Sequence, residues 1–169
     1  MRHAPLLAAA TLAVAVAASA QGPTQEADDD ACRREVVELH RFLERWSNAE
    51  LPADDEAFAR FDRAIAPGFT LVSPSGEMSE REAIVAAVRR AHGRWLPEGG
   101  RIEVRNYRFH AASGDLVVCS YEEWHHLPRG RNGRLSSAVL TADPAAPGGL
   151  AWLHLSEVWL EAPSPAGSP

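Results

Sequence analysis

Lysine is absent from this chain, in which all seventeen basic side chains are arginine. Without a lysine amine the protein cannot form a Schiff base with a carbonyl substrate, and it cannot supply the lysine of a P-loop. The chain also lacks the glycine fingerprint of dinucleotide-binding proteins and the Gly-x-Ser-x-Gly elbow of serine hydrolases. These absences exclude several large enzyme classes, and we expect a protein that works without a cofactor.

A net positive charge is also absent, because 23 acidic residues outnumber the 17 arginines and leave a formal net charge of −6. A protein that binds nucleic acid normally shows the opposite balance. The ligand spacings of the common zinc sites are missing, and the neighbours His125 and His126 would point to opposite faces of a strand. We therefore expect neither a nucleic-acid partner nor a bound metal.

Cysteine is scarce, with only Cys32 and Cys119 in the sequence. The first falls at the start of a predicted helix and the second in the middle of a predicted strand. An oxidising compartment would permit a disulfide between them, but free cysteine is common in protein cores. We favour two separately packed thiols.

The first twenty residues have the features of a secretory signal peptide. A short positive start precedes an apolar run over residues 6–18, and Ala18-Ser19-Ala20 has the small-x-small form of a cleavage site. The run is shorter than the roughly 20 residues that a membrane-spanning helix needs. We expect residues 1–20 to be removed and the remainder to be exported, to the periplasm or the medium, without a membrane anchor.

Three helices are predicted in the first part of the chain. Apolar residues at helical spacing indicate a helix over residues 31–48, after a loose polar leader whose residues 28–30 can cap it. A second helix should start at Asp54 and Asp55 and end at Pro67-Gly68. A third should start at a capping box, with Ser79 at the N-cap and Glu82 three residues later, and stop at Gly93.

Almost everything after the third helix has the pattern of β-strands. Alternating or β-branched runs predict one early strand and four later ones, over residues 69–72, 102–111, 116–126, 134–142 and 150–160. Helices segregated from a run of antiparallel strands define the α+β class. We expect one domain over residues 31–161, followed by a disordered Pro-, Ser- and Gly-rich tail at 162–169.

The stretch over residues 117–126 combines a β-branched start with an ionisable end. On a strand, Tyr121 and Glu123 share one face, and Glu122 and Trp124 share the other. If the first face lines a cavity, burial should raise the pKa of Glu123, which could then act as a general acid or base while Tyr121 holds a carbonyl oxygen. The alternative is a polar pair, bonded to Arg134, that only shapes the pocket.

The last predicted strand has apolar residues on both faces, which suggests that one face meets the helices and the other meets a second subunit. Trp152 and His154 share one face of this strand and are candidate pocket residues. His154 could pair with Glu123, although a satisfied core histidine is the simpler interpretation. Trp46, on the apolar stripe of the first helix, packs in the core or lines the pocket mouth.

Four stretches, at residues 69–76, 91–93, 120–124 and 150–157, together resemble the nuclear-transport-factor-2-like superfamily in their order and spacing. The similarity is greatest to bacterial proteins related to its polyketide cyclase-like and ketosteroid isomerase-like branches. The resemblance implies a cone of curved antiparallel sheet closed by three N-terminal helices, with a pocket inside. Catalytic isomerases of that branch place an aspartate base in the pocket, but no aspartate of this chain falls on a predicted strand.

Three functions remain open on this basis. The first is the binding of a small, largely apolar molecule in a pocket lined by Trp46, Tyr121, Glu123, Trp152 and His154. The second is a cofactor-free isomerase, cyclase or dehydratase that uses Glu123 and Tyr121. The third is a homodimeric association module whose pocket has no remaining role.

Overall fold

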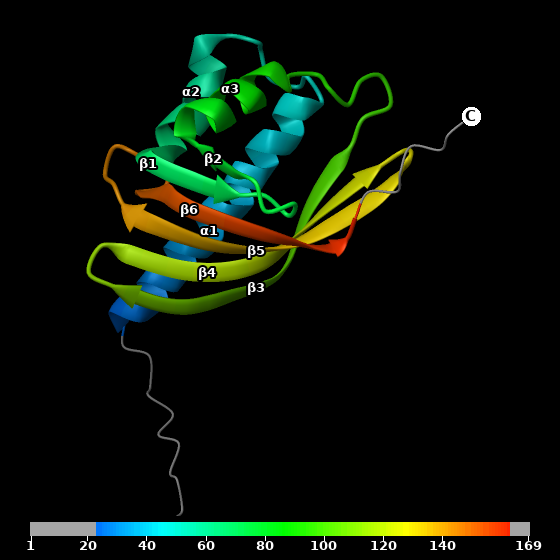
Figure 1. The fold of residues 1–169 in the computed structure, drawn as a ribbon. Helices are drawn as coiled ribbons and strands as arrows, with labels where there is room; N and C mark the ends of the chain where they lie inside the picture. The colour runs from blue at the N-terminus through cyan, green and yellow to red at the C-terminus, as the bar shows by residue number, and fades with distance from the viewer. Residues whose placement is uncertain (1–22, 163–169) are drawn as a thin grey trace, which may run out of the picture.

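The computed structural model describes residues 23–162, so the predicted signal peptide and most of the predicted tail lie outside the described residues. The described chain forms three helices and six strands (Figure 1). In chain order they are α1 (Pro23–Ser47), α2 (Asp55–Ala64), β1 (Ile65–Val72), β2 (Met78–Glu80), α3 (Arg81–Arg90), β3 (Arg101–Ser113), β4 (Leu116–Leu127), β5 (Gly130–Ala142) and β6 (Leu150–Glu161).

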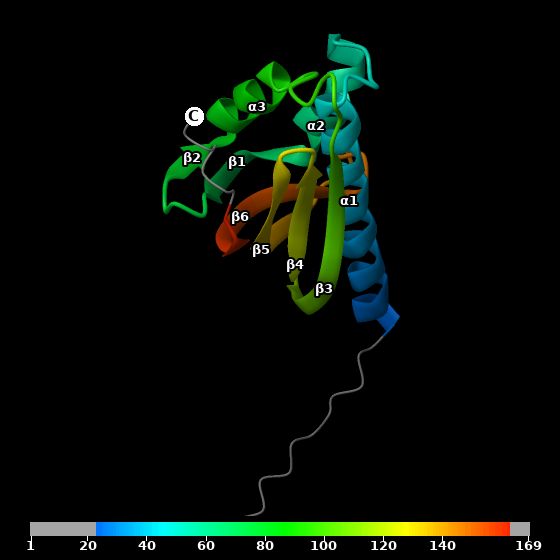
Figure 2. The same ribbon diagram turned by 90° about the vertical axis from the view of Figure 1, so that its right-hand side faces the viewer.

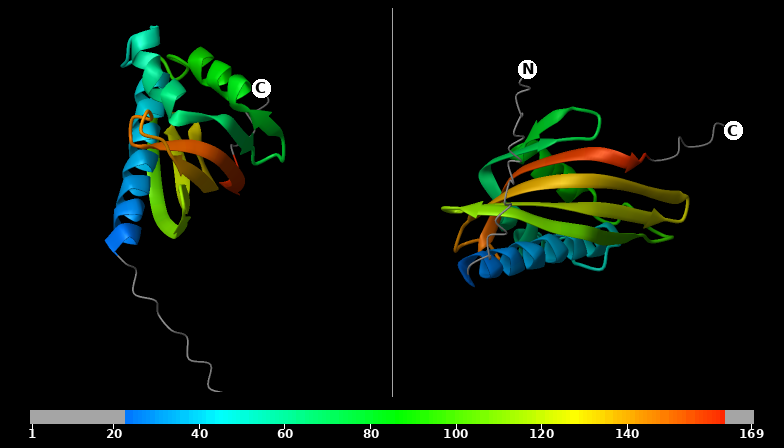
Figure 3. Two further views of the ribbon diagram at one scale, coloured as in Figure 1. Left: turned by 90° about the vertical axis from the view of Figure 1, so that its left-hand side faces the viewer. Right: turned by 90° about the horizontal axis from the view of Figure 1, so that it is seen from below.

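All six strands form one curved sheet in the order β2-β1-β6-β5-β4-β3. Helix α1 runs along one face of this sheet, and α2 and α3 lie over one end of it (Figures 2 and 3). This arrangement confirms the predicted α+β class. The sheet is mixed rather than wholly antiparallel, however, because β1 pairs with β6 in parallel. The two strands are far apart in sequence, so no tight turn forces them to be antiparallel.

Helix α1 begins at Pro23, eight residues before the predicted start at residue 31. The acidic residues 28–30 therefore lie inside the helix instead of capping it. Glu26 lies in the first turn of α1, where an acidic side chain interacts favourably with the helix dipole. The buried residues Cys32, Val36, Leu39 and Trp46 form the stripe that faces the sheet. Among the described residues, no helix has the length and apolar character needed to cross a bilayer.

Helix α2 starts as predicted, since the Asp54 carboxylate accepts a hydrogen bond from the Ala57 amide at 2.9 Å. It ends at Ala64, three residues before the predicted stop. Pro67 and Gly68 lie in β1, within a stretch where the pairing with β6 is irregular. A proline is tolerated there because it cannot donate a hydrogen bond and irregular pairing requires none.

Helix α3 starts at Arg81, and the predicted capping box is wrong. Ser79 lies in β2, and the N-cap residue Glu80 makes no side-chain cap. The Arg81 guanidinium instead donates to the Ile65 carbonyl at 3.1 Å and to the Asp62 carboxylate at 2.8 Å, which ties the start of α3 to the end of α2. No residue of α3 is fully buried, and its apolar side covers the open end of the sheet.

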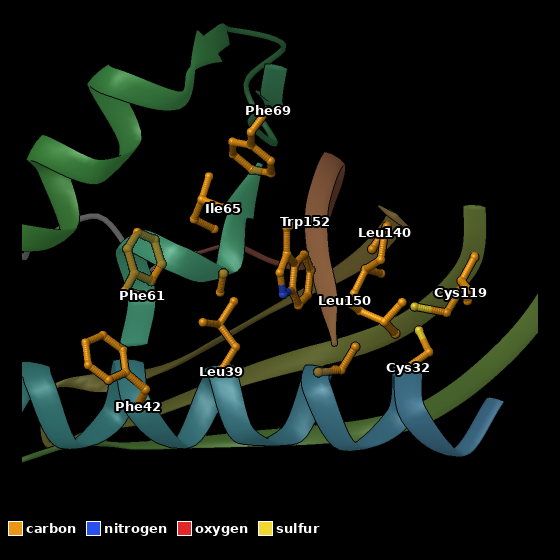
Figure 4. Packing of buried hydrophobic residues seen from close by; sticks show 14 of the residues in the cluster. Cys32, Leu39, Phe42, Phe61, Ile65, Phe69, Cys119, Leu140, Leu150 and Trp152 are labelled. Atoms are coloured by element: carbon orange, nitrogen blue, oxygen red, sulfur yellow. The ribbon is translucent and has the colours of Figure 1, made fainter. Parts of the chain in front are cut away.

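The core between α1, α2 and the sheet is rich in aromatic rings (Figure 4). Phe42 stacks on Trp46 and on Phe61, with ring centroids 5.7 and 6.0 Å apart. Further along α1, Cys32 faces Cys119 of β4, and both are buried free thiols. The core thus fixes α1 against β4 and leaves room for a pocket under α3.

Candidate functional site

A pocket of about 220 Å³ lies between the helices and the inner face of the sheet. Its walls are mostly aliphatic and aromatic, and its remaining lining is ionisable or phenolic. The apolar lining consists of Leu39, Leu43, Phe61, Ile65, Phe69, Leu71, Ile84, Ala87, Val88, Ile102, Trp152 and Leu155. The polar lining consists of His40, Arg94, Tyr121, Glu123, His125, Arg134 and Glu157. Pockets of this kind, apolar with a few convergent polar groups, are typical of small-molecule sites.

Strand β4 presents Tyr121, Glu123 and His125 to this pocket, as its alternation predicts. Their neighbour Glu122 bonds instead to Trp124 and Asn106 outside the pocket. The structure thus places the face of Tyr121 and Glu123, which the sequence left as one of two possibilities, toward the pocket.

Strand β6 contains a bulge that the sequence did not reveal. Val139 pairs with His154 but the next residue, Leu140, pairs with Trp152, so Leu153 is an extra residue on β6. A bulge changes the face on which all following side chains lie. Glu157 therefore joins Trp152 in the pocket, although simple alternation separates them.

His154 and Trp46 lie outside the pocket, contrary to expectation. The bulge turns His154 to the other face of the sheet, where its Nδ1 lies 2.8 Å from the hydroxyl of Thr70 on β1. Trp46 is buried in the aromatic core, and its indole donates to the Val88 carbonyl at 2.8 Å. Of the two roles considered for Trp46, packing in the core and lining the pocket mouth, the structure shows the first.

Glu123 is the centre of the polar floor of the pocket. Its Oε1 accepts from His125 Nε2 at 2.5 Å and from Arg134 Nη2 at 3.2 Å, and its Oε2 lies 3.2 Å from His40 Nε2. Burial disfavours the charged form, but the Arg134 and His40 charges and these hydrogen bonds outweigh it and hold the pKa of Glu123 well below its usual range. The expectation that burial would raise this pKa is wrong, and Glu123 is an ionised anchor.

His40 is the main pocket residue that the sequence patterns did not indicate. Its Nδ1 donates to the Val36 carbonyl at 2.6 Å, so a bond from Nε2 to Glu123 requires a second proton. Burial opposes this charge, but the Glu123 carboxylate raises the pKa of His40 above the ordinary value. A histidine four residues after Val36, on the buried stripe of a helix, was the available signal.

Glu157 is the second buried carboxyl of the floor. It accepts from Arg134 Nη1 at 3.2 Å and from the Ser136 hydroxyl at 3.5 Å. Burial raises the pKa of Glu157, and Arg134 only partly offsets that effect. The environment that we predicted for Glu123 is thus found at Glu157.

Tyr121 is fully buried, and its hydroxyl has no hydrogen-bond partner among the described residues. Ser136 is its cross-strand neighbour but turns to Glu157. Burial, together with the charges of Glu123 and Glu157, raises the pKa of Tyr121 well above its usual value, so the phenol keeps its proton. Edge-to-face contacts with His40 and Trp152 fix the ring. The pocket lining thus contains a fixed hydroxyl that has no hydrogen-bond partner within residues 23–162.

The profile of the sucrose-6-phosphate phosphohydrolase C-terminal family matches residues 32–161. The chain belongs to this family. A probable sucrose-phosphatase 3a from Arabidopsis thaliana is 25% identical to this chain over 127 residues, which are 75% of the chain and 30% of the plant protein. The chain therefore spans about 30% of the length of this plant relative.

Solved structures confirm the resemblance to the nuclear-transport-factor-2-like superfamily. An NTF-2-like protein of unknown function from Pseudomonas aeruginosa is 29% identical, with a TM-score of 0.68 over 76% of this chain and 98% of the other. A putative ketosteroid isomerase from Shewanella frigidimarina is 14% identical, with a TM-score of 0.57 over 77% and 96%. A CaMKII hub from S. rosetta is also 14% identical, with a TM-score of 0.56 over 77% and 95%. The last two similarities concern the fold alone.

Proposed function

We propose that this protein binds a small molecule that is largely apolar and carries one polar group. The observation that carries this proposal is the hydroxyl of Tyr121, which is buried in an apolar pocket and has no partner among the described residues. An unsatisfied buried polar group costs about 1–3 kcal/mol, so a site that keeps one gains when a ligand supplies the partner. The apolar walls would bury the rest of the ligand.

A test is native mass spectrometry of the protein purified from the envelope fraction of its own host. The proposal expects a bound organic molecule that is released on unfolding, and a smaller bound fraction in Tyr121→Phe than in the unchanged protein. Equal occupancy in the two proteins would contradict the role of the hydroxyl. Recovery from the envelope fraction would also support the proposal that residues 1–20 direct export.

A second candidate is a cofactor-free enzyme of the isomerase, cyclase or dehydratase type. The observation that favours it is the raised pKa of Glu157 beside the protonated Tyr121, because a carboxyl that titrates closer to neutral pH is a better general acid or base. Glu123 is unsuited to that role, since its oxygens already accept from three side chains.

We also propose that the protein forms a homodimer through the outer face of its sheet. Leu135 and Val158 are cross-strand neighbours on that face and are 39% and 55% exposed. Leu160, two residues further along β6, is 48% exposed. A second copy of the chain would cover the apolar strip of Leu135 and Val158 with an identical one, as in a two-fold symmetric interface. The CaMKII hub and association domains that share this fold are compatible with such a role.

A further inference from the structure

We propose that the pocket selects an organic carboxylate, with the acid group held at its polar end between Tyr121, Arg134 and Arg94. This inference rests on the proposed binding function and names the class of ligand. It follows from a surplus of hydrogen-bond donors over acceptors in the pocket.

The acceptors of the pocket are already occupied. Both oxygens of Glu123 accept bonds, from His125 and Arg134 at Oε1 and from His40 at Oε2. Glu157 likewise accepts from Arg134 and Ser136. A ligand that offers only donors, such as an ammonium group, would compete with these side chains for the carboxylate lone pairs.

Three donors of the pocket lining, in contrast, lack a hydrogen-bond partner within residues 23–162. The Tyr121 hydroxyl and Arg134 Nε are buried and unbonded. Arg94, on the segment after α3, is an exposed residue that lines the pocket. Its guanidinium lies 5.1 Å from the centroid of the Trp95 ring and forms no ion pair with a described carboxylate. A carboxylate has two oxygens that accept several hydrogen bonds, and arginine binds it especially well.

The charges of the pocket favour the same ligand. Two guanidinium groups and His40, which pairs with Glu123 as a cation, line the pocket against two carboxyl groups, and burial raises the pKa of one of these, Glu157. Partial burial and the nearby charge of Arg134 also lower the pKa of Arg94. An anion placed between these two guanidinium groups would relieve their repulsion, whereas a cation would increase it.

The volume of the pocket limits the apolar part of the acid. A cavity of about 150 Å³ holds benzene, so a pocket of about 220 Å³ has space for roughly nine non-hydrogen atoms. Octanoate, octan-1-ol and octylammonium are suitable probes because they share one alkyl chain and differ in the charge of the head group.

Calorimetric titration of the full chain with these three probes, at one pH and ionic strength, tests the inference. Octanoate is expected to bind about tenfold more tightly than octan-1-ol, and octylammonium is expected to bind most weakly. If the alcohol or the amine binds as tightly as the acid, the carboxylate inference is overturned and the proposed binding function stands. If none of the three binds, both proposals are overturned.

Two matched variants identify the groups responsible. Arg94→Gln should weaken octanoate about tenfold and leave octan-1-ol unchanged. Arg90→Gln removes the same charge from an exposed position outside the pocket and should change neither affinity. Equal losses for acid and alcohol in Arg94→Gln, or equal losses for octanoate in the two variants, would overturn the role of Arg94.

Discussion

Glu123 on β4 and His40 on α1 lie 3.2 Å apart at the floor of the pocket, and their contact joins the central strand to the long helix. His40 also donates to the Val36 carbonyl, so the contact pairs an imidazolium with a carboxylate. Both side chains are buried. The stability of the domain therefore depends on two charges that water does not screen.

Glu123→Gln should destabilise the protein by about 3–5 kcal/mol, because it leaves the buried charges of His40 and Arg134 without their shared partner. Glu157→Gln is the matched comparison and should cost less, since Arg134 keeps its bond to Glu123. Urea denaturation of the two variants measures the difference. Equal losses of unfolding free energy would show that Glu123 is not the centre of this network.

The pH dependence of stability should contain a contribution from His40. Its folded pKa is raised, so the contribution is complete below the unfolded value of about 6.5 and is lost as pH rises through the folded pKa. Glu123 acts in the opposite sense, and its contribution is lost only as pH falls through its lowered pKa.

Urea midpoints of the unchanged protein and of His40→Asn, measured from mildly acidic to alkaline pH, separate these effects. The two curves should converge as pH rises. His110→Asn alters an exposed histidine and should keep the slope of the unchanged protein. Parallel curves for the unchanged protein and His40→Asn would refute an imidazolium at position 40.

Tyr121→Phe should leave the free energy of unfolding unchanged or raise it slightly, because the lost hydroxyl has no partner among the described residues. The other tyrosine of the chain is the control. The Tyr107 hydroxyl donates to the Asp29 carbonyl at 3.3 Å, so Tyr107→Phe should cost about 0.5–1.5 kcal/mol. A larger loss for Tyr121→Phe than for Tyr107→Phe would mean that the Tyr121 hydroxyl is bonded in the folded protein.

Gly148→Ala should destabilise the protein by about 1–3 kcal/mol, because a Cβ there would lie 2.5 Å from Glu35 Oε2. Arg60 and the Trp152 indole hold that carboxylate in place at 2.9 and 3.1 Å. Since Trp152 lines the pocket, the substitution should also weaken ligand binding. Gly68→Ala has space for its methyl group, and thermal denaturation should show little change for it.

Val158→Arg should convert the proposed homodimer to monomer, since it places a charge in the exposed apolar strip of the outer face. Sedimentation velocity measures the change. Met78→Arg is the control, because Met78 is also highly exposed but lies on β2, away from the strip. A monomeric unchanged protein, or equal dissociation by both substitutions, would contradict this interface.

The pattern of apolar residues was enough to predict the fold class and most elements. Val36, Leu39 and Trp46 recur at helical spacing, and β4 alternates strictly, so each element is specified by residues near one another in sequence. The same local rule put Tyr121 and Glu123 on one face of β4, and the structure places both in the pocket lining. The rule failed at the start of α1 and at the capping box of α3. The start of α3 depends on the tertiary contacts of Arg81 with Ile65 and Asp62.

The sequence by itself determined which side chains of β4 share a face, because alternation along an unbroken strand is a local property. Only the tertiary structure decided the rest of the pocket. The bulge at Leu153 depends on how β6 pairs with β5, and it exchanges Glu157 for His154 in the lining. The packing of α1 then brings His40 to Glu123, and the charges of Arg134 and His40 together reverse the pKa shift that burial alone would cause. Register and electrostatic pairing join distant segments of the chain, so local patterns do not encode them.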